Sequence, residues 1–203
     1  MSDTDGGRKG AAAIDGYLSD ASELSVIIAR FHETRGRVLA VAAEALAARL
    51  GAGGKVLAFG NGGSAAEAQH FAAELVNGLG RRDRRPLPAI ALTADTSTLT
   101  AIGNDRGFDR VFARQIEAMG RPGDVALALT TSGTSPNVIE ALKTARAEGL
   151  MTIVLTGEKS GPAAPLADFL LDAPSCSTAR IQEAHLFILH HLARCLEEAA
   201  GRP

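Results

Sequence analysis

Apolar residues recur at helical spacing from Ile14 to Leu50, where Leu, Ile, Val and Ala return every three or four residues. One stripe consists of Ile14, Tyr17, Leu18, Leu24, Ile27, Ile28 and Phe31, and a second of Val38, Val41, Ala45 and Leu46. This spacing is typical of amphipathic helices. We expect two N-terminal helices over 14–52, with a break near Arg35-Gly36 because glycine weakens a helix interior.

Beyond residue 54 the chain changes to short apolar runs, at 55–59, 89–92, 124–129, 152–155 and 169–171. Runs this short are typical of strands buried on both faces of a sheet. Helical spacing fills the intervals at 65–79, 111–119 and 137–149, and continues over 179–200. Alternating strands and helices predict an α/β fold, a three-layer sandwich around a five-stranded, mostly parallel sheet. We expect one domain over 14–203 that includes the N-terminal helices.

Composition narrows the class of protein. Hydrophobic residues make up 46% and charged residues 22% of the 203 positions, as in soluble globular proteins. A net charge of −2 argues against binding to nucleic acid or an anionic membrane. Cys176 and Cys195 form no CxxC motif, which excludes a disulfide scaffold and a thiolate zinc finger. We expect a cytoplasmic protein without a membrane span or signal peptide, with residues 1–13 disordered.

A glycine-rich loop, Gly60-Asn-Gly-Gly-Ser64, follows the first predicted strand. Ligands of parallel sheets bind at the carboxyl ends of strands, and glycines let the backbone approach them closely. Ser64 and Glu67 fit a capping box that opens a helix, whose free N–H groups favour an anion. A dinucleotide fingerprint is disfavoured because the first acid after the next strand, Asp95, lies much farther than the roughly 20 residues that this motif requires. A turn that binds nothing is the alternative.

A hydroxyl-rich loop follows the third predicted strand. Five hydroxyls surround Gly133, namely those of Thr130, Thr131, Ser132, Thr134 and Ser135. Ser135 suits a helix N-cap and Pro136 the first helical position. One such loop alone indicates only a turn, but two ligand-type loops after neighbouring strands favour a phosphorylated small molecule.

Ionisable residues gather on two predicted helices. His70 and Glu74 are four residues apart and share a helix face, which on a surface is usually only a weak ion pair. The C-terminal helix carries Gln182, Glu183, His185, His190 and His191. The spacing leaves open which of them face the sheet. Imidazole, carboxylate and amide groups together suit zinc or a similar divalent ion.

Several separated motifs together resemble those of the phosphoheptose isomerases, which are SIS-domain proteins. The matching segments are Gly60–Ser64, Gln69–Glu74, Leu99–Asp105, Thr131–Ser135 and Arg180–His185 followed by His190, in matching order between about residues 38 and 196. The resemblance implies a flavodoxin-like SIS fold. It also implies interconversion of sedoheptulose 7-phosphate and D-glycero-D-manno-heptose 7-phosphate, an early step of ADP- or GDP-heptose biosynthesis. It implies a homotetramer with sites near subunit interfaces and N-terminal helices packed between subunits.

The resemblance also assigns roles to residues of this chain. Substrate contacts are implied for Asn61, Gly62, Gly63, Ser64, Glu74, Asn104, Asp105 and Gln182, and phosphate contacts for Thr130, Thr131, Ser132 and Ser135. One zinc ion per subunit is implied at His70, Glu74, Gln182 and His190, with Glu74 and His190 as the acid/base pair. The chain departs from the family at Thr130, where serine is usual, and at Thr134, where asparagine or lysine is frequent.

A ketose-to-aldose conversion needs one group to move a proton between C1 and C2, and we expect Glu74 to do so while His190 serves the oxygens. A carboxylate bound to a metal is a poor base, so the ion can be catalytic, structural or inhibitory. Two alternatives stay open. One is a non-catalytic SIS regulatory protein of the replication-initiator-binding type, whose members lack the acid/base pair; the other is an isomerase of another ketose phosphate.

Overall fold

Five parallel strands form the centre of the fold. A computed structural model describes residues 4–81 and 83–201, with side chains from residue 14 onward. The strands are β1 (Val56–Gly60), β2 (Ala89–Ala91), β3 (Val125–Thr130), β4 (Met151–Thr156) and β5 (Phe169–Asp172). Every pairing is parallel and the order is β2-β1-β3-β4-β5, a doubly wound sheet of the flavodoxin type. The five predicted strands and the predicted fold class are confirmed.

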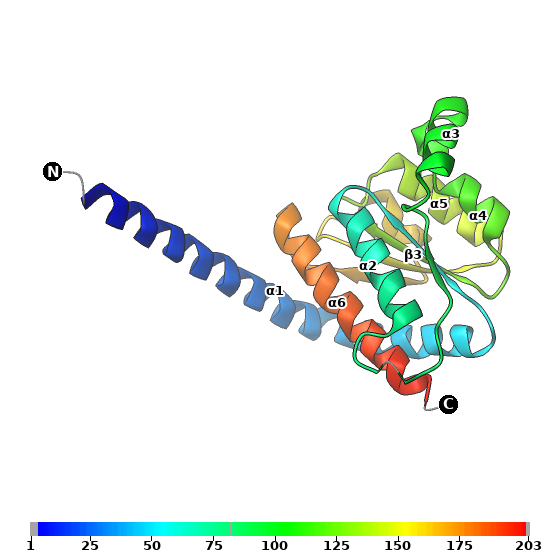
Figure 1. The fold of residues 1–203 in the computed structure, drawn as a ribbon, viewed down its shortest axis with the longest axis horizontal. Coiled ribbons are helices and arrows are strands. Elements are labelled where there is room, and N and C mark those ends of the chain that lie inside the picture. The colour runs from blue at the N-terminus through cyan, green and yellow to red at the C-terminus, as the bar shows by residue number, and fades with distance from the viewer. Residues whose placement is uncertain (1–3, 82, 202–203) are drawn as a thin grey trace.

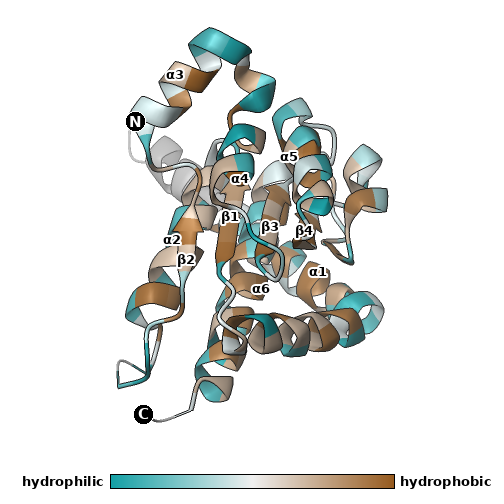
Figure 2. Cartoon of the chain, turned by 90° about the vertical axis from the view of Figure 1, so that its right-hand side faces the viewer, coloured by the Kyte–Doolittle hydropathy of each residue, from teal (hydrophilic) through white to brown (hydrophobic). Residues whose placement is uncertain are grey.

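Helices cover both faces of this sheet (Figure 1). They are α1 (Thr4–Gly51), α2 (Gly63–Asn77), α3 (Thr96–Arg106), α4 (Ala113–Met119), α5 (Pro136–Ala147) and α6 (Thr178–Ala199), with short 3₁₀ turns at Phe108–Arg110 and Gly161–Leu166. The sequence pattern misses α3, because it buries only Ile102 and has no apolar stripe. This helix stands out from the body and mixes hydrophobic, neutral and hydrophilic residues (Figure 2).

The N-terminal segment is one helix of 48 residues, so the expected break near Arg35-Gly36 is wrong. A single glycine lowers helix stability by only about 1 kcal/mol, and no proline is present to stop the helix. Buried contacts through Phe31, Leu39 and Leu46 hold its C-terminal half against the core. The backbone of residues 4–13 continues this helix in place of the disordered end that composition predicts, and residues 1–3 lie outside the described part.

Strand residues alternate between two cores. Val56, Val125 and Ile153 face the layer made by α1, α2 and α6. Leu57, Ala126 and Val154 face the layer made chiefly by α4 and α5. The three-layer sandwich predicted from the sequence is therefore present. Among the described residues, we find no helix whose length and apolarity would let it span a membrane.

Candidate active site and metal centre

A cavity of about 320 Å³ lies where β1 and β3, adjacent in the sheet, both end. The connections from these strands run to opposite faces, and doubly wound sheets bind ligands at such a switch point. The structure brings both predicted loops to this cavity, together with the start of α6. Its lining consists of Asn61, Gly62, Gly63, Ser64, Leu129, Thr130, Thr131, Ser135, Thr178 and Gln182.

The glycine loop is shaped by close approaches of its backbone. A Cβ on Gly60 would lie 2.7 Å from the carbonyl oxygen of Leu129, and one on Gly63 would lie 2.4 Å from Nε2 of Gln182. Helix α2 begins at Gly63 with Gly62 as N-cap at φ 57°, so the predicted capping box is wrong. Ser64 lies inside the first turn because the chain enters the helix through Gly62, whose positive φ a glycine adopts without strain.

The hydroxyl loop uses part of its hydroxyls to hold its own shape. Thr130 Oγ1 accepts a hydrogen bond from the N–H of Gly133 at 3.2 Å. Ser132 Oγ accepts from the backbone N–H of Thr134 at 3.2 Å, and it lines a neighbouring cavity instead of this one. Ser135 is the N-cap of α5 and Pro136 its first residue, as predicted, and the Ser135 hydroxyl makes no capping bond. Thr131 and Ser135 both line the cavity, and the Ser135 hydroxyl lies 3.5 Å from that of Thr130.

A pair of amides that sequence reasoning missed joins the two loops. Asn61 Nδ2 donates to Asn137 Oδ1 at 2.9 Å, and Asn137 Nδ2 donates to Asn61 Oδ1 at 2.8 Å. Asn137 is buried at the start of α5. An asparagine in a first helical turn is common, so no sequence signal marked it. The pair fixes the spacing of the two loops across the cavity.

Asn104 and Asp105 do not join these residues in the single chain. Both are exposed on α3, where Asn104 Nδ2 donates to Asp105 Oδ1 at 2.8 Å. Neither lines the described cavity, and their contact with substrate stays a prediction.

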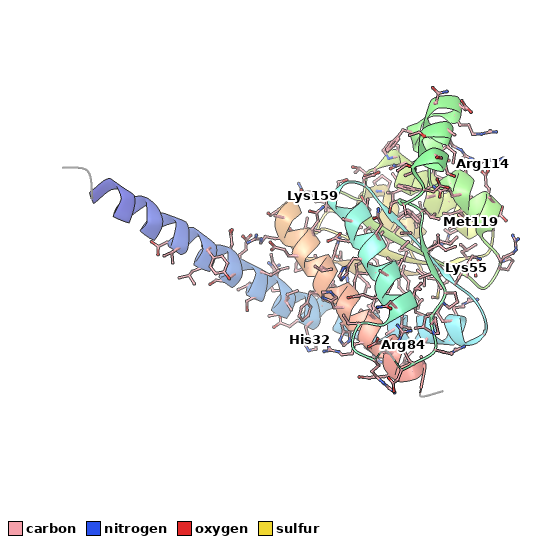
Figure 3. The ribbon with its side chains drawn as sticks, viewed as in Figure 1. His32, Lys55, Arg84, Arg114, Met119 and Lys159 are labelled. Atoms are coloured by element: carbon pink, nitrogen blue, oxygen red, sulfur yellow. The ribbon has the colours of Figure 1, made fainter. Side chains whose placement is uncertain are left out.

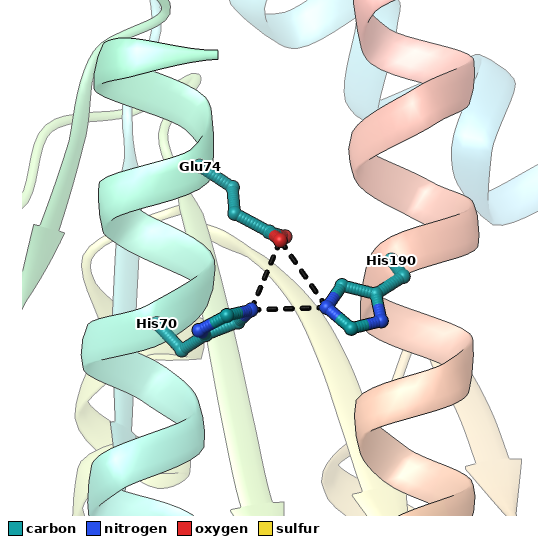
Figure 4. Close-up of side chains that lie close together, drawn as sticks. All are labelled: His70, Glu74 and His190. Carbon is teal, nitrogen blue, oxygen red and sulfur yellow. Dashed lines mark hydrogen bonds and ion pairs between the residues drawn. The ribbon is translucent and has the colours of Figure 1, made fainter. Parts of the chain in front are cut away.

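Three predicted site residues meet between α2 and α6, as Figure 4 shows. Glu74 Oε1 lies 2.9 Å from His70 Nε2 and 3.2 Å from His190 Nε2, and the two imidazole nitrogens are 3.0 Å apart. The Glu74 side chain is 8% exposed, whereas those of His70 and His190 are 48% and 40% exposed. The carboxylate is thus buried and the imidazoles remain within reach of a ligand.

The other polar residues of α6 serve different purposes. His185 is fully buried and its Nε2 lies 3.0 Å from the carbonyl oxygen of Thr156, while Glu183 accepts from Arg180 at 2.8 Å. Gln182 lies eight residues before His190, about 12 Å along the helix axis, and lines the cavity beside Gly63. Helix α6 therefore reaches from the cavity to the histidine–glutamate group.

The cluster of His70, Glu74 and His190 can hold a metal ion. Its ligand atoms all lie within 4.8 Å of one another, and Glu74 Oε2 is buried without a hydrogen-bond partner. Two imidazoles and one carboxylate are a donor set typical of zinc and similar divalent ions.

Glu67 is a buried carboxyl group that sequence reasoning placed only in a helix cap. It lies on α2 seven residues before Glu74, hence on the same helix face, and its Oε2 has no partner. Burial raises the pKa of Glu67 to about 7, although a bond from Ser64 partly offsets this. The seven-residue spacing to Glu74 is the sequence signal that would have indicated its burial.

The fold and the cavity at its switch point agree with comparisons to known proteins. The family model for the SIS domain matches residues 21–157. A phosphoheptose isomerase of Aquifex aeolicus is 56% identical over 153 residues, which cover 75% of this chain and 80% of that protein. The phosphoheptose isomerase of Solidesulfovibrio magneticus is 49% identical over 179 residues, covering 88% and 87%.

A solved structure of a phosphoheptose isomerase is also similar to this chain. The phosphoheptose isomerase of Neisseria gonorrhoeae superposes with a TM-score of 0.85 at 42% identity, over 92% of this chain and 99% of that one. Among SIS domain proteins, the chain belongs to the phosphoheptose isomerase family.

Proposed function

We propose that this protein interconverts sedoheptulose 7-phosphate and D-glycero-D-manno-heptose 7-phosphate by proton transfer through an enediolate. The observation that carries the proposal is the contact between the buried Glu74 carboxylate and the His190 imidazole, 3.2 Å apart, on two helices that both begin at the switch-point cavity. Non-catalytic SIS relatives lack this acid/base pair, so its presence favours an enzyme.

The cavity suits the phosphate end of the substrate. The hydroxyl-bearing residues Thr131 and Ser135 line it, and α2 and α5 begin beside it with N–H groups that attract an anion. The reacting carbons C1 and C2 lie at the opposite end of an open-chain heptose 7-phosphate. With the phosphate anchored in the cavity, this end extends along α2 and α6 toward Glu74 and His190.

Glu74 and His190 divide the proton transfers. Glu74 removes the proton from C1 of the ketose and returns it to C2 of the enediolate, on one face of the sugar. His190 gives a proton to the oxygen on C2 and accepts one from the oxygen on C1, so the atoms balance. Glu74 Oε1 lies against both imidazoles, and we assign the carbon-bound proton to the Glu74 carboxylate as a whole.

We assign zinc to His70, Glu74 and His190. Gln182, the further ligand that the family resemblance implies, lies about 12 Å along α6 from His190 and lines the cavity beside Gly63. When bound, this ion polarises the substrate carbonyl and stabilises negative charge on oxygen. Glu74 and His190 would then be ligands and acid/base groups at once, so they could exchange protons with the sugar only through atoms that do not bind the ion.

We further propose a cytoplasmic homotetramer. The N-terminal half of α1 extends away from the body (Figure 1), and four large apolar side chains on it are exposed, those of Ile14, Tyr17, Leu18 and Val26. Packing this stripe between subunits would bury it, and exposed apolar stripes of this kind mark protein–protein contacts.

The test is proton exchange in deuterated water. We expect purified protein to convert sedoheptulose 7-phosphate to an aldose with deuterium incorporated at C1 of recovered ketose and C2 of product, read by NMR. Absence of both conversion and exchange would exclude the isomerase. Repeating the assay with five-, six- and seven-carbon ketose phosphates distinguishes the heptose substrate from a shorter one.

A further inference from the structure

A buried ion pair between Arg84 and Glu197 lies near the Glu74–His190 contact and has no part in the proposed proton transfers. Arg84 comes from the segment between α2 and β2, and Glu197 from the last turn of α6. Their side chains are 1% and 4% exposed, and Arg84 Nε lies 3.3 Å from Glu197 Oε1. In Figure 3, Arg84 is labelled beside the ends of α2 and α6.

The guanidinium of Arg84 joins the two helices that carry the site. Its Nη2 donates to the backbone carbonyl of Glu74 at 2.7 Å, while its Nε donates to Glu197. Glu197 also accepts the backbone N–H groups of Leu79, at 2.7 Å, and Gly80, at 3.1 Å, in the turn that ends α2. The end of α2 is thus bonded to α6 through one arginine and one carboxylate.

These bonds act at the residues of the acid/base pair. Glu197 follows His190 by seven residues, so the two lie on the same face of α6, two turns apart. The side-chain carboxylate of Glu74 contacts His190, and the backbone carbonyl of Glu74 accepts a hydrogen bond from Arg84. We propose that Arg84 and Glu197 are positioning residues that set the separation of Glu74 and His190; this inference rests on the proposed function.

Stability alone does not explain a buried ion pair at this place. Removing two charges from water is costly, and an apolar pair of similar volume often stabilises a fold equally well. What the pair adds is direction, because the planar guanidinium places several N–H donors in a fixed geometry. Fixed geometry matters where two groups must stay within hydrogen-bond distance on separate helices.

Two matched variants test the proposal. Asp124 is the control, because it is also a buried carboxylate that pairs with a cation, Lys55, and accepts backbone N–H groups, but at the amino ends of β1 and β3. We expect Glu197→Gln to lower kcat about 10–100-fold with KM nearly unchanged, and to weaken Co²⁺ binding by a similar factor. We expect Asp124→Asn to lose thermal stability while kcat and Co²⁺ affinity stay within about twofold of wild type.

A double variant keeps the test informative if Glu197→Gln folds poorly. Arg84→Met combined with Glu197→Leu fills the same space without charges and should fold. We expect its kcat and Co²⁺ affinity to be reduced as in Glu197→Gln. Wild-type values for this double variant would show that the pair serves stability alone and would overturn the proposal. Wild-type protein without isomerase activity would contradict the proposed function instead, and Co²⁺ affinity would still test the positioning.

Discussion

Burial acts in opposite directions on two ionisable side chains near the site. It raises the pKa of Glu67 from 4.5 to about 7 because the charged carboxylate loses its water. It lowers the pKa of His185 from 6.5 to about 4, although a bond to the Thr156 carbonyl opposes this. Both side chains are therefore uncharged in the folded protein between about pH 4 and 7.

Glu67 makes folding stability depend on pH. Its folded pKa exceeds the unfolded value, so the native state binds more protons between pH 4.5 and about 7, and its stabilising contribution falls as pH rises through this window. Relative to wild type, we expect the free energy of unfolding of Glu67→Gln to rise by up to about 3 kcal/mol as the pH is raised from 4.5 to 8. Urea unfolding at a series of pH values measures this, with the exposed Glu148→Gln as control. A constant difference between Glu67→Gln and wild type would contradict it.

His185 changes the folding stability with pH in the opposite direction. Its folded pKa lies below the unfolded value, so the unfolded state binds more protons and stability is lost as pH falls from 6.5 to about 4. In this range it offsets Glu67, and the wild-type curve should be flatter than that of Glu67→Gln.

Glu74 carries the carbon proton transfer in the proposed mechanism. Replacement by Gln keeps the volume but removes the base, so we expect Glu74→Gln to lower kcat about 10²–10⁴-fold while sugar phosphate still binds. Calorimetric titration measures binding and deuterium exchange at C1 measures the chemical step. Glu44→Gln, on the exposed face of α1, is the control. Exchange at the wild-type rate in Glu74→Gln would exclude its assigned role.

At the scale of elements, α2 and α6 each connect the cavity to the proposed acid/base pair, Glu74 and His190. Gly63 and Gln182 touch at the cavity, and Glu74 and His190 meet farther along the same two helices. The same two helices therefore link the proposed sites of substrate anchoring and proton transfer. The loops at their starts set the cavity, and the ends near Arg84 set the helix separation.

Gly133 determines the shape of the hydroxyl loop. It adopts φ 67°, and a Cβ there would lie 2.0 Å from the carbonyl oxygen of Ser160. We expect Gly133→Ala to raise KM for the sugar phosphate at least about 10-fold and to destabilise the fold by more than about 1 kcal/mol. Steady-state kinetics and thermal unfolding measure both. The control is Gly51→Ala at the C-terminal end of α1, where a Cβ meets no atom within 4 Å. Unchanged KM in Gly133→Ala would remove the loop from substrate binding.

At the scale of the whole molecule, the sheet places the ligand cavity and α1 provides an apolar surface. The C-terminal half of α1 completes the core through Phe31, Leu39 and Leu46. Its N-terminal half exposes Tyr17 and Leu18 by 71% and 56%. A helix that belongs to the core at one end and exposes apolar residues at the other suits contact with further subunits.

A charge placed in this stripe tests the assembly. We expect Leu18→Asp to lower the molar mass in light scattering from that of a tetramer to that of dimers or monomers, since burying an unpaired carboxylate is costly. Ser19→Asp, one position along the same helix, controls for added charge. A wild-type protein that is monomeric at micromolar concentration would refute the tetramer.

Local patterns were sufficient for the strands and for most helices. Runs of β-type residues between helical stretches predict a parallel sheet because two-sided burial leaves few polar positions. The loops at Gly60–Ser64 and Thr130–Ser135 were predicted at the cavity because the ends of parallel strands share one edge. The predicted start of α2 was wrong, because Gly62 and not Ser64 is the N-cap. Which of the two residues caps the helix depends on how closely the backbone of this loop lies to β3, and the local sequence does not show that.

The chemistry of the site required contacts between distant parts of the chain. His190 meets His70 across 120 positions of sequence. Periodicity could not choose it, because the buried stripe of α6 includes His185, whereas His190 and His191 both lie half-buried beside that stripe. The same limit applies to the continuous α1, the Asn61–Asn137 pair and Arg84, whose partners lie on other elements. Propensity and spacing describe neighbours along a helix or strand; the packing of α2 against α6 is what places a buried carboxylate between two imidazoles.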